Sequence, residues 1–262
     1  MKLIASDLDG TLFDVDHQPA PRTVAAVNAA VDVGIVVAAV TGRSYFSGAP
    51  LAISTGAKLD WFIGSNGGHR VDYATNDLEE RLIFAPDHVE EICAGVDAAL
   101  DTVAFAWEVG DGLVWNQAFL DMSPTTQSRP RVVMERGDVG ITEVGKIFVA
   151  HPDVMSVDLV NLVEPHVDDQ LNVTTSGAKF VEITPDGADK GSALARLCEK
   201  LDIDRTDVVA FGDNQNDLTM LEWAGTGVAM GNALDIVKAV ADDVTAPNWE
   251  HGVAQVIETL IG

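Results

Sequence analysis

Five short apolar runs recur along the chain, and small polar or acidic residues follow each of them directly. The runs cover residues 3–6, 35–40, 61–63, 208–211 and 228–230. Because they are apolar at nearly every position, they predict strands buried on both faces, as in a parallel sheet covered by helices. A helical pattern begins at Pro21 and ends at Gly34, between the first two runs. This alternation predicts an α/β fold with a doubly wound, Rossmann-like parallel sheet.

The middle of the chain has a different pattern, in which helices and hairpin-like strands mix. A helical stripe of apolar residues starts at Val89. Strand patterns, two of them flanking a glycine-rich turn, cover residues 102–107, 113–115, 146–149 and 179–183. We therefore expect residues 83–184 to form an α+β domain inserted into a core built from residues 1–82 and 185–262.

The polar residues at the ends of the core runs are the candidates for chemistry. They are Asp7 and Asp9 after the first run, Thr41, Gly42 and Arg43 after the second, Asn66 after the third, and Asp213, Asn216 and Asp217 after the fourth. In open α/β sheets, ligands bind outside the carboxyl ends of the strands. We therefore expect residues more than 200 positions apart in the sequence to meet in one crevice.

The acidic residues in this set favour a cation site. Asp7 and Asp9 are two positions apart, so on extended backbone their side chains point the same way. Together with Asp213 and Asp217 they suit a hard divalent cation, and Mg²⁺ is the first choice because it binds few protein carboxylates plus water and phosphate. The Asp7–Asp9 pair alone fits a solvated turn equally well. The other strand ends favour the metal site.

A phosphoryl group would also fit this crevice. A carboxylate such as Asp7 can act as a nucleophile on phosphorus, although two unit charges 4 Å apart repel by about 4 kcal/mol at an effective dielectric of 20. Lys190 stands where a helix is expected to begin and could offset that repulsion, although on its own it reads as an ordinary surface lysine. The segment Thr41–Arg43 offers a hydroxyl, backbone N–H groups and a cation to the same group.

The bulk composition excludes other classes of function. The chain of 262 residues carries 41 acidic and 16 basic residues, a net charge of −25. This charge argues against binding to nucleic acid or to an anionic membrane surface. The apolar runs are too short to span a bilayer and no signal-peptide pattern is present. Cys93 and Cys198 form no metal or disulfide pattern, so we expect free thiols and a cytoplasmic protein.

Four motifs resemble, in order, those of haloacid dehalogenase-like (HAD) phosphatases. They are DLDGT at 7–11, TGR at 41–43, DKG at 189–191 and GDNQND at 212–217. The tail, GVAMGNA at 227–233 and APNWEHGVA at 246–254, resembles the Cof-type subfamily, HAD-IIB. In that subfamily an α+β cap lies between the second and third motifs. The resemblance implies the same fold here, with residues 83–184 as the cap that determines substrate specificity.

The resemblance also implies roles for individual residues. Asp7 would be the nucleophile that forms an aspartyl-phosphate, and Asp9 would protonate the leaving alcohol and then activate water. Thr41 would hold the phosphoryl group and Lys190 would neutralise charge. The implied Mg²⁺ ligands are Asp7, Asp9 through its main-chain carbonyl, Asp213 and Asp217, the last through water or by holding Lys190. The implied substrate contacts are Thr41, Gly42, Arg43, Asn66 and Asn216.

The leading hypothesis is a Mg²⁺-dependent phosphomonoesterase that acts on small phosphorylated metabolites, with sugar phosphates as the expected class. One alternative is a phosphosugar mutase or phosphotransferase, which would pass the phosphoryl group from the same aspartate to a sugar hydroxyl. Another is a non-catalytic sensor that binds a phosphometabolite, although intact acids at positions 7, 9 and 213 argue against it. The sequence leaves open whether the protein is a monomer or a homodimer.

Overall fold

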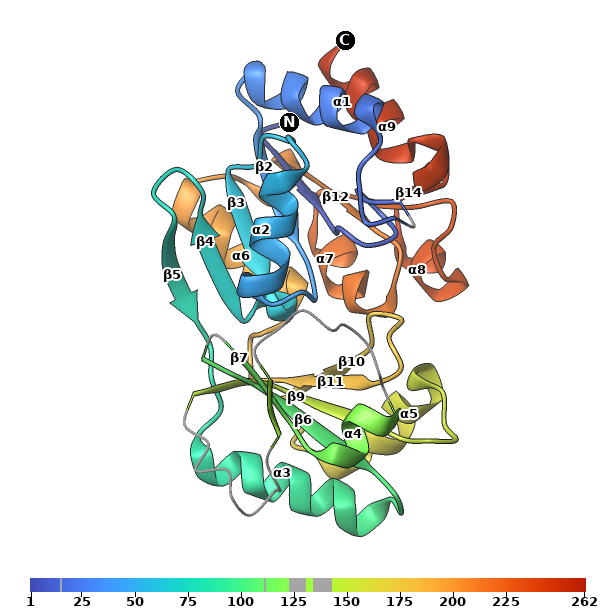
Figure 1. The fold of residues 1–262 in the computed structure, drawn as a ribbon. Coiled ribbons are helices and arrows are strands. Elements are labelled where there is room, and N and C mark those ends of the chain that lie inside the picture. Colours follow the sequence, from blue (N-terminus) through green and yellow to red (C-terminus); the bar gives the residue numbers. More distant parts are fainter. Residues whose placement is uncertain (15, 111, 123–130, 134–142) are drawn as a thin grey trace. The chain divides into compact units, whose positions relative to one another are not determined.

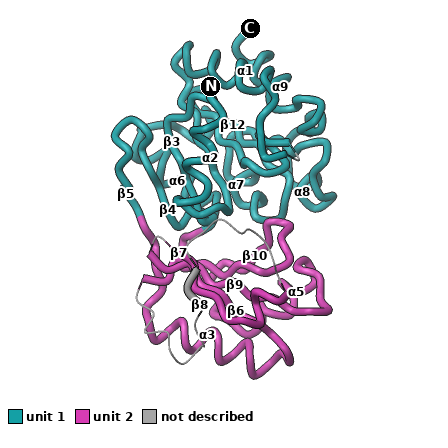
Figure 2. The backbone as a smooth tube through the Cα atoms, viewed as in Figure 1, with its two compact units in different colours: residues 1–80, 189–262 teal, residues 81–188 magenta. Residues whose placement is uncertain are grey.

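The computed structural model describes residues 1–14, 16–110, 112–122, 131–133 and 143–262. The chain divides into two compact units, which Figure 2 distinguishes by colour. The first unit contains residues 1–80 and 189–262, and the second contains residues 81–188. The two ends of the chain therefore fold together, and one continuous segment forms the second unit.

The first unit is built on a mixed sheet, drawn in Figure 1. Among the described residues this sheet has eight strands, in the order β14-β13-β12-β1-β2-β3-β4-β5. Their bounds are β1 Leu3–Ser6, β2 Val36–Val40, β3 Trp61–Gly64, β4 His69–Asp72, β5 Asp77–Arg81, β12 Val208–Gly212, β13 Thr226–Ala229 and β14 Asp243–Val244. The strands from β14 to β3 pair in parallel, and β4 pairs antiparallel with β3.

The predicted parallel α/β core is confirmed. The first four apolar runs coincide with β1, β2, β3 and β12 to within a residue at most ends, and the fifth run lies about two residues beyond the start of β13. Ala5 stands between Ala38 and Ala210 on the neighbouring strands, and all three are fully buried. Larger side chains here would overpack the sheet, at a cost of about 1–3 kcal/mol.

The helices of the first unit come from both ends of the chain. They are α1 Pro21–Asp32, α2 Tyr45–Ser54, α6 Lys190–Leu201, α7 Leu218–Trp223, α8 Asp235–Val240 and α9 Gly252–Ile261. The shorter 3₁₀ turns are η1 Ser65–Gly67, η4 Arg205–Asp207, η5 Gln215–Asp217 and η6 Asn248–Glu250. Helices α1 and α9 lie side by side and are joined by an ion pair between Arg22 and Glu258 (Figure 1). Proline at the first position of α1 suits a helix start.

The second unit has a mixed, mainly antiparallel sheet with helices, as the α+β pattern predicts. Its described strands follow the order β10-β11-β9-β6-β7-β8. Their bounds are β6 Ala104–Val109, β7 Gly112–Trp115, β8 Arg131–Val133, β9 Val144–Ala150, β10 Asn172–Thr174 and β11 Val181–Thr184. The helices are α3 Pro86–Ala99, α4 Gln117–Met122 and α5 Ser156–Val163, with a 3₁₀ turn, η3, at Glu164–His166. A separate core includes Val96, Trp107 and Ile147, so this unit buries its own apolar face.

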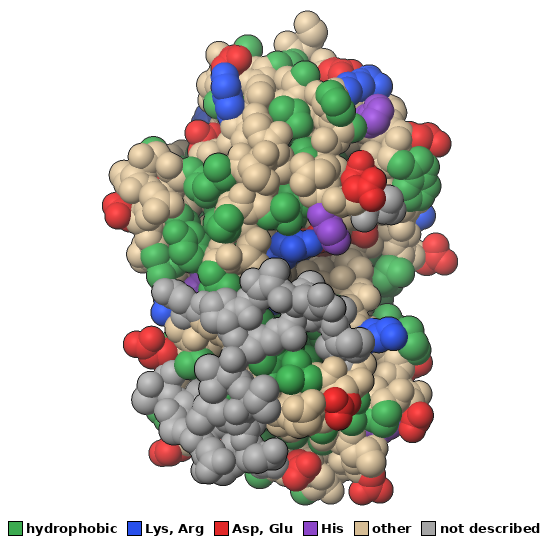
Figure 3. Space-filling view, in the orientation of Figure 1, with side chains coloured by type: hydrophobic (Ala, Val, Ile, Leu, Met, Phe, Trp, Pro, Cys, Tyr) green, Lys and Arg blue, Asp and Glu red, His purple; other side chains and the backbone are tan. Residues whose placement is uncertain are grey.

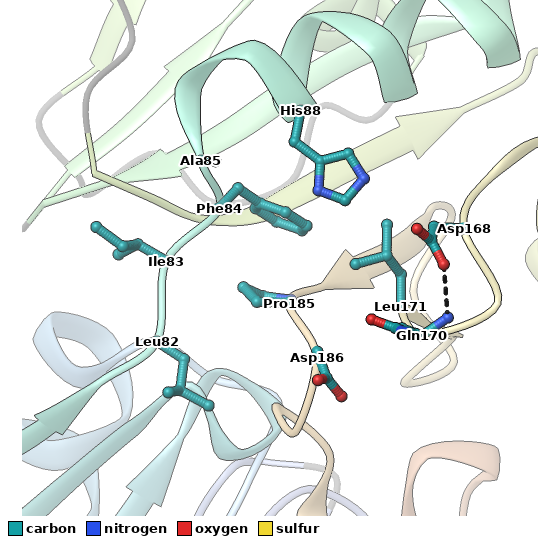
Figure 4. A pocket seen from close by; sticks show the side chains of 10 residues that line it. All are labelled: Leu82, Ile83, Phe84, Ala85, His88, Asp168, Gln170, Leu171, Pro185 and Asp186. Atoms are coloured by element: carbon teal, nitrogen blue, oxygen red, sulfur yellow. Dashed lines mark hydrogen bonds between the residues drawn. The ribbon is translucent and has the colours of Figure 1, made fainter.

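The surface has one pocket of note in the second unit and a broad scatter of acidic side chains. A pocket of about 250 Å³ lies within the second unit, between the segment 82–85, the start of α3 and residues 168–171 and 185–186 (Figure 4). On the face drawn in Figure 3, acidic side chains are scattered over both units and form no single patch. In the described part of the chain, no helix has the length and apolar character needed to cross a bilayer.

Candidate active site

The site is built where strands β1 and β12 end. The backbone N–H of Asp7 donates to the carbonyl of Phe211 at 3.0 Å, which extends the pairing of the two strands by one residue. Asp7 is buried, with 6% of its surface exposed. Gly10 follows with φ +82°, and a Cβ atom on it would lie 2.4 Å from Oδ2 of Asp213. A glycine is therefore required for the turn to bring these two strand ends together.

A buried lysine joins the two strand ends electrostatically. Nζ of Lys190 lies 2.6 Å from Oδ1 of Asp7 and 2.5 Å from Oδ1 of Asp217. Lys190 opens α6, where Asp189 caps the helix by accepting a hydrogen bond from the N–H of Ser192 at 2.9 Å. Burial opposes the charge of Lys190, but Asp217 and Asp7 outweigh it and raise its pKa. The ammonium group is thus held charged, directly beside the Asp7 carboxylate.

Asp217 is fixed on both sides of its carboxylate. While Oδ1 accepts from Lys190, Oδ2 accepts from the backbone N–H groups of Asp213 and Asn214, both at 2.9 Å. The contact with the N–H of Asn214 is one half of a capping box at the start of η5, and the Asn214 side chain makes the other half. Asp217 therefore contacts Lys190 directly. Holding Lys190 is one of the two roles that the resemblance implies for Asp217, and it stays a prediction.

The carboxylates suit a divalent cation. Among the described residues, Asp7, Asp213 and Asp217 each offer an oxygen within 4.8 Å of the others. Burial and the charge of Asp217 raise the pKa of Asp213 to about 7, although Thr11 donates to its Oδ1 at 2.9 Å. Burial likewise raises the pKa of Asp7 well above its usual value. Three carboxylates facing one ammonium group leave an excess of negative charge, which a hard cation would balance.

The Asp9 carboxylate faces a different partner. Nε and Nη2 of Arg43 lie 2.5 and 2.6 Å from its two oxygens, and Nδ1 of His17 lies 2.9 Å from Oδ1. Burial opposes the ionised form, but Arg43 and His17 outweigh it and lower the pKa of Asp9. Because the side chain is engaged in this way, a metal contact from Asp9 would come from its main-chain carbonyl. That contact stays a prediction.

The segment Thr41–Arg43 is held by the strand beside it. The N–H of Thr41 donates to the carbonyl of Ile63 at 2.8 Å, and its own carbonyl accepts from the N–H of Asn66 at 3.0 Å. Oγ1 of Thr41 accepts from the N–H of Arg43 at 3.2 Å, so Gly42 lies inside a tight turn. Thr41 is 1% exposed. This places a hydroxyl and backbone amides at the same sheet edge as Asp7.

The structure also brings Asn66 and Asn216 together. Nδ2 of Asn216 donates to Oδ1 of Asn66 at 3.0 Å, and both residues are buried. Ser65, Asn66 and Gly67 all have positive φ, of 51°, 56° and 104°. Two consecutive non-glycine residues in this region store strain, which is typical of functional sites. The predicted residues at four strand ends therefore do lie at one edge of the sheet, and their roles stay predictions.

Sequence reasoning gave no role to two neighbours of the site. His17 contacts both Asp9 and Arg43, although nothing in the spacing of the sequence marks it. Asn232 donates to the carbonyl of Gly10 at 2.8 Å and accepts from the N–H of Asn248 at 3.0 Å. Asn232 follows the fifth apolar run, so its position at a strand end was the available signal. Both residues support the turn that carries Asp7 and Asp9.

Comparisons with known proteins give matches along nearly the whole chain. A protein-family model described as haloacid dehalogenase-like hydrolase matches residues 4–257. The chain is 32% identical over 259 residues to a 5-amino-6-(5-phospho-D-ribitylamino)uracil phosphatase of Bacillus subtilis, an alignment that covers 98% of this chain and 94% of that protein.

Solved structures show the same fold. A haloacid dehalogenase-like hydrolase from B. subtilis superposes with a TM-score of 0.85 at 27% identity, covering 99% of this chain and 100% of that one. A sugar phosphatase of HAD subclass IIB superposes with a TM-score of 0.82 at 22% identity, covering 99% of both chains. The predicted Rossmann-like core with an inserted α+β domain is therefore confirmed.

Proposed function

Because this chain belongs to the haloacid dehalogenase-like hydrolases, in the Cof-type group, and is a phosphatase, we propose that it hydrolyses sugar or polyol phosphates with Mg²⁺. The buried contact of Lys190 with Asp7 and Asp217 carries the proposal. A lysine in that position offsets the repulsion between the Asp7 carboxylate and an approaching phosphate dianion. The substrate class is supported by the ribityl phosphate in the name of one relative and by the sugar phosphatase with the same fold.

In the first step, the Asp7 carboxylate attacks phosphorus. A bond forms between an Asp7 oxygen and phosphorus, and the bond from phosphorus to the leaving oxygen breaks. Asp9 gives that oxygen a proton, so an alcohol departs. Lys190, 2.6 Å from Oδ1 of Asp7, offsets the repulsion between the two anions. The hydroxyl of Thr41 and the amides beside it hold the transferring group.

In the second step, water attacks the aspartyl-phosphate. Asp9, now ionised, takes a proton from the water as its oxygen bonds to phosphorus. The bond between phosphorus and Asp7 breaks, which releases phosphate and restores the Asp7 carboxylate. Asp9 then carries the proton needed for the next turnover. The same residue serves as acid and base because it gains in the second step the proton that it gives in the first.

The metal would be held by Asp7 and Asp213, with the main-chain carbonyl of Asp9 completing the protein ligands. When bound, Mg²⁺ supplies positive charge that stabilises the developing negative charge on the phosphoryl oxygens. Asp217 is already engaged with Lys190 and two backbone amides, so it supports the site through Lys190. We assign the choice among phosphomonoesters to residues 81–188.

The test is phosphate release from a panel of sugar and polyol phosphates, with Mg²⁺ or with EDTA. The variants are Asp7→Asn and, as a matched control, Asp77→Asn on the exposed strand β5. The proposal predicts release that requires both Mg²⁺ and Asp7 and that is unaffected in the control. Turnover that depends on a bisphosphate activator would instead indicate a mutase. Tight binding without turnover on any member of the panel would indicate a sensor.

A further inference from the structure

His17 touches both charged partners at the open side of the site. Its Nδ1 lies 2.9 Å from Oδ1 of Asp9 and 3.1 Å from Nη2 of Arg43. The imidazole comes from the segment between β1 and α1, whereas Arg43 comes from the end of β2. Asp9 is therefore held by two residues that come from separate segments of the chain.

The backbone at His17 is specialised for this contact. His17 has φ +56°, a left-handed conformation that costs most residues about 1–2 kcal/mol. Asp14 closes the turn, because its carbonyl accepts from the N–H of His17 at 3.1 Å and its N–H donates to the carbonyl of Gln18 at 3.0 Å. Oδ1 of Asp14 also accepts from the N–H of Asp16 at 2.9 Å. Backbone strain that such contacts maintain beside a functional group indicates that His17 has a functional role.

Arg43 has two anionic partners in the proposed reaction. It binds both oxygens of Asp9, and it is also the cation of the Thr41–Arg43 segment, whose hydroxyl and amides are proposed to hold the phosphoryl group of the substrate. A phosphoryl dianion competes with a carboxylate for a guanidinium group. Asp9 would lose its main support when the substrate binds, at the moment when its position matters most.

We propose that His17 is a positioning residue that holds the Asp9 carboxyl group in place when Arg43 turns to the substrate. Nδ1 can donate to Asp9 or accept from Arg43, but a single nitrogen serves one partner at a time. Once Arg43 turns to the phosphoryl group, the Nδ1–H bond to Asp9 remains. Asp9 then stays aimed at the leaving oxygen. This inference rests on the proposed function, because it assigns the proton transfer to Asp9.

The test uses substitutions that separate the contact from the backbone strain. His17→Asn places an amide where Nδ1 lies and tolerates positive φ, whereas His17→Gly relieves the strain but removes the contact. Asn76→Gly is the matched control, because Asn76 also has positive φ, of 59°, in the turn between β4 and β5. Each protein is assayed with an alkyl phosphate and with p-nitrophenyl phosphate, whose leaving group needs no proton.

The expected result is a loss that depends on the leaving group. His17→Gly should lower kcat/KM for the alkyl phosphate by about tenfold, a part of the 10²–10⁴ that acid–base catalysis contributes, and should change kcat/KM for p-nitrophenyl phosphate by less than about threefold. This ratio reports the formation of the aspartyl-phosphate, in which Asp9 acts as the acid, and not the later step, in which Asp9 acts as the base for both substrates. His17→Asn should recover most of the loss. Equal losses on both substrates, or none, would overturn the proposal.

A structural measurement decides the question independently of activity. Crystal structures of the wild-type protein and both variants should show the Asp9 carboxyl group in the same place in wild type and His17→Asn, and moved in His17→Gly when a phosphate analogue is bound. An unmoved Asp9 in His17→Gly would overturn the role of His17. Absence of wild-type phosphate release would instead contradict the proposed function, so the two failures are distinguishable.

Discussion

Two ion-pair clusters lie at the same sheet edge, and they differ in burial and in consequence. Asp7 belongs to the first, with Lys190 and Asp217, whose side chains are fully buried. Asp9 belongs to the second, in which the side chains of Asp9, Arg43 and His17 are 37%, 22% and 59% exposed. Although the two aspartates are two residues apart, burial raises the pKa of Asp7 whereas Arg43 and His17 lower that of Asp9.

The difference suggests a division of labour. A buried cluster keeps its charges fixed and desolvated, which strengthens every interaction made with a developing charge. A half-exposed cluster can exchange partners and protons with solvent and substrate. The first arrangement suits a nucleophile. The second suits an acid that gains and loses a proton in each turnover once Arg43, which lowers the pKa of Asp9, turns to the phosphoryl group as proposed.

The largest effect is expected from breaking the buried cluster. Lys190→Met removes the charge but keeps the length of the side chain, and it leaves Asp7 and Asp217 without their shared cation. Phosphate release should fall by at least about 1,000-fold, and the free energy of unfolding by about 3–5 kcal/mol. Lys58→Met is the control, because Lys58 forms an exposed pair with Asp32 that is worth at most about 1 kcal/mol. Similar losses of stability in the two variants would show that the buried cluster is no stronger than an exposed ion pair.

Removing the acid should affect chemistry far more than stability. Asp9→Asn should lower kcat/KM for alkyl phosphates by about 10²–10⁴ and have a smaller effect on kcat/KM for p-nitrophenyl phosphate. Because the Asp9 side chain is 37% exposed, urea unfolding should show a change of about 1 kcal/mol or less. A large loss of stability would place Asp9 with the buried cluster instead.

The metal should bind more tightly as pH rises. The pKa of Asp213 is raised to about 7 by burial and by Asp217, so below pH 7 a proton competes with Mg²⁺ for this carboxylate. Titration calorimetry should show affinity rising by up to about tenfold per pH unit towards pH 7 and then levelling off.

The same shift predicts how pH affects the metal-free protein. The folded pKa of Asp213 lies above its ordinary value of 3.8, so the unfolded chain releases this proton first. The contribution of Asp213 therefore destabilises the folded state progressively as pH rises from about 4 to 7, and added Mg²⁺ should reverse this loss. Stability that is independent of Mg²⁺ at pH 8 would contradict the assignment of Asp213 as a ligand.

The smallest effect is expected from an exposed pair far from the chemistry. Arg22 and Glu258 join α1 to α9, and their side chains are 47% and 42% exposed. Arg22→Met should change the free energy of unfolding by about 0.2–1 kcal/mol and leave phosphate release unchanged. Thermal unfolding at low and high salt would measure this. A loss comparable with that of Lys190→Met would show that burial does not govern the strength of these pairs.

Buried strands were easier to predict from the sequence than exposed ones. Strands β1, β2 and β12 are apolar at nearly every position, so their runs were recognisable. Strand β5, with the sequence Asp-Leu-Glu-Glu-Arg, was not, because its pairing at the sheet edge needs no apolar pattern. Helix α2 was missed as well, since Pro50 stands inside it and disrupts a helical signal.

The candidate site shows the same limit. Asp7, Thr41, Lys190 and Asp213 directly follow strands or open a helix, so elementary rules of sheet topology collect them. The opposite pKa shifts of Asp7 and Asp9 were not predictable, because burial raises the pKa of Asp7 whereas the approach of Arg43 and His17 lowers that of Asp9. His17 was not either, because a left-handed turn and not a periodic element brings it to Asp9.

The most direct test of the central claim is whether Asp7 carries the phosphoryl group. Wild-type protein and Asp9→Asn would be mixed with a sugar phosphate and Mg²⁺, quenched rapidly in acid, and digested for peptide mass spectrometry. The account predicts one phosphoryl group on Asp7 during turnover, none when EDTA is present, and accumulation in Asp9→Asn if loss of the base slows hydrolysis more than formation. Rapid phosphate release with Asp7 unmodified, or modification of another residue, would contradict it.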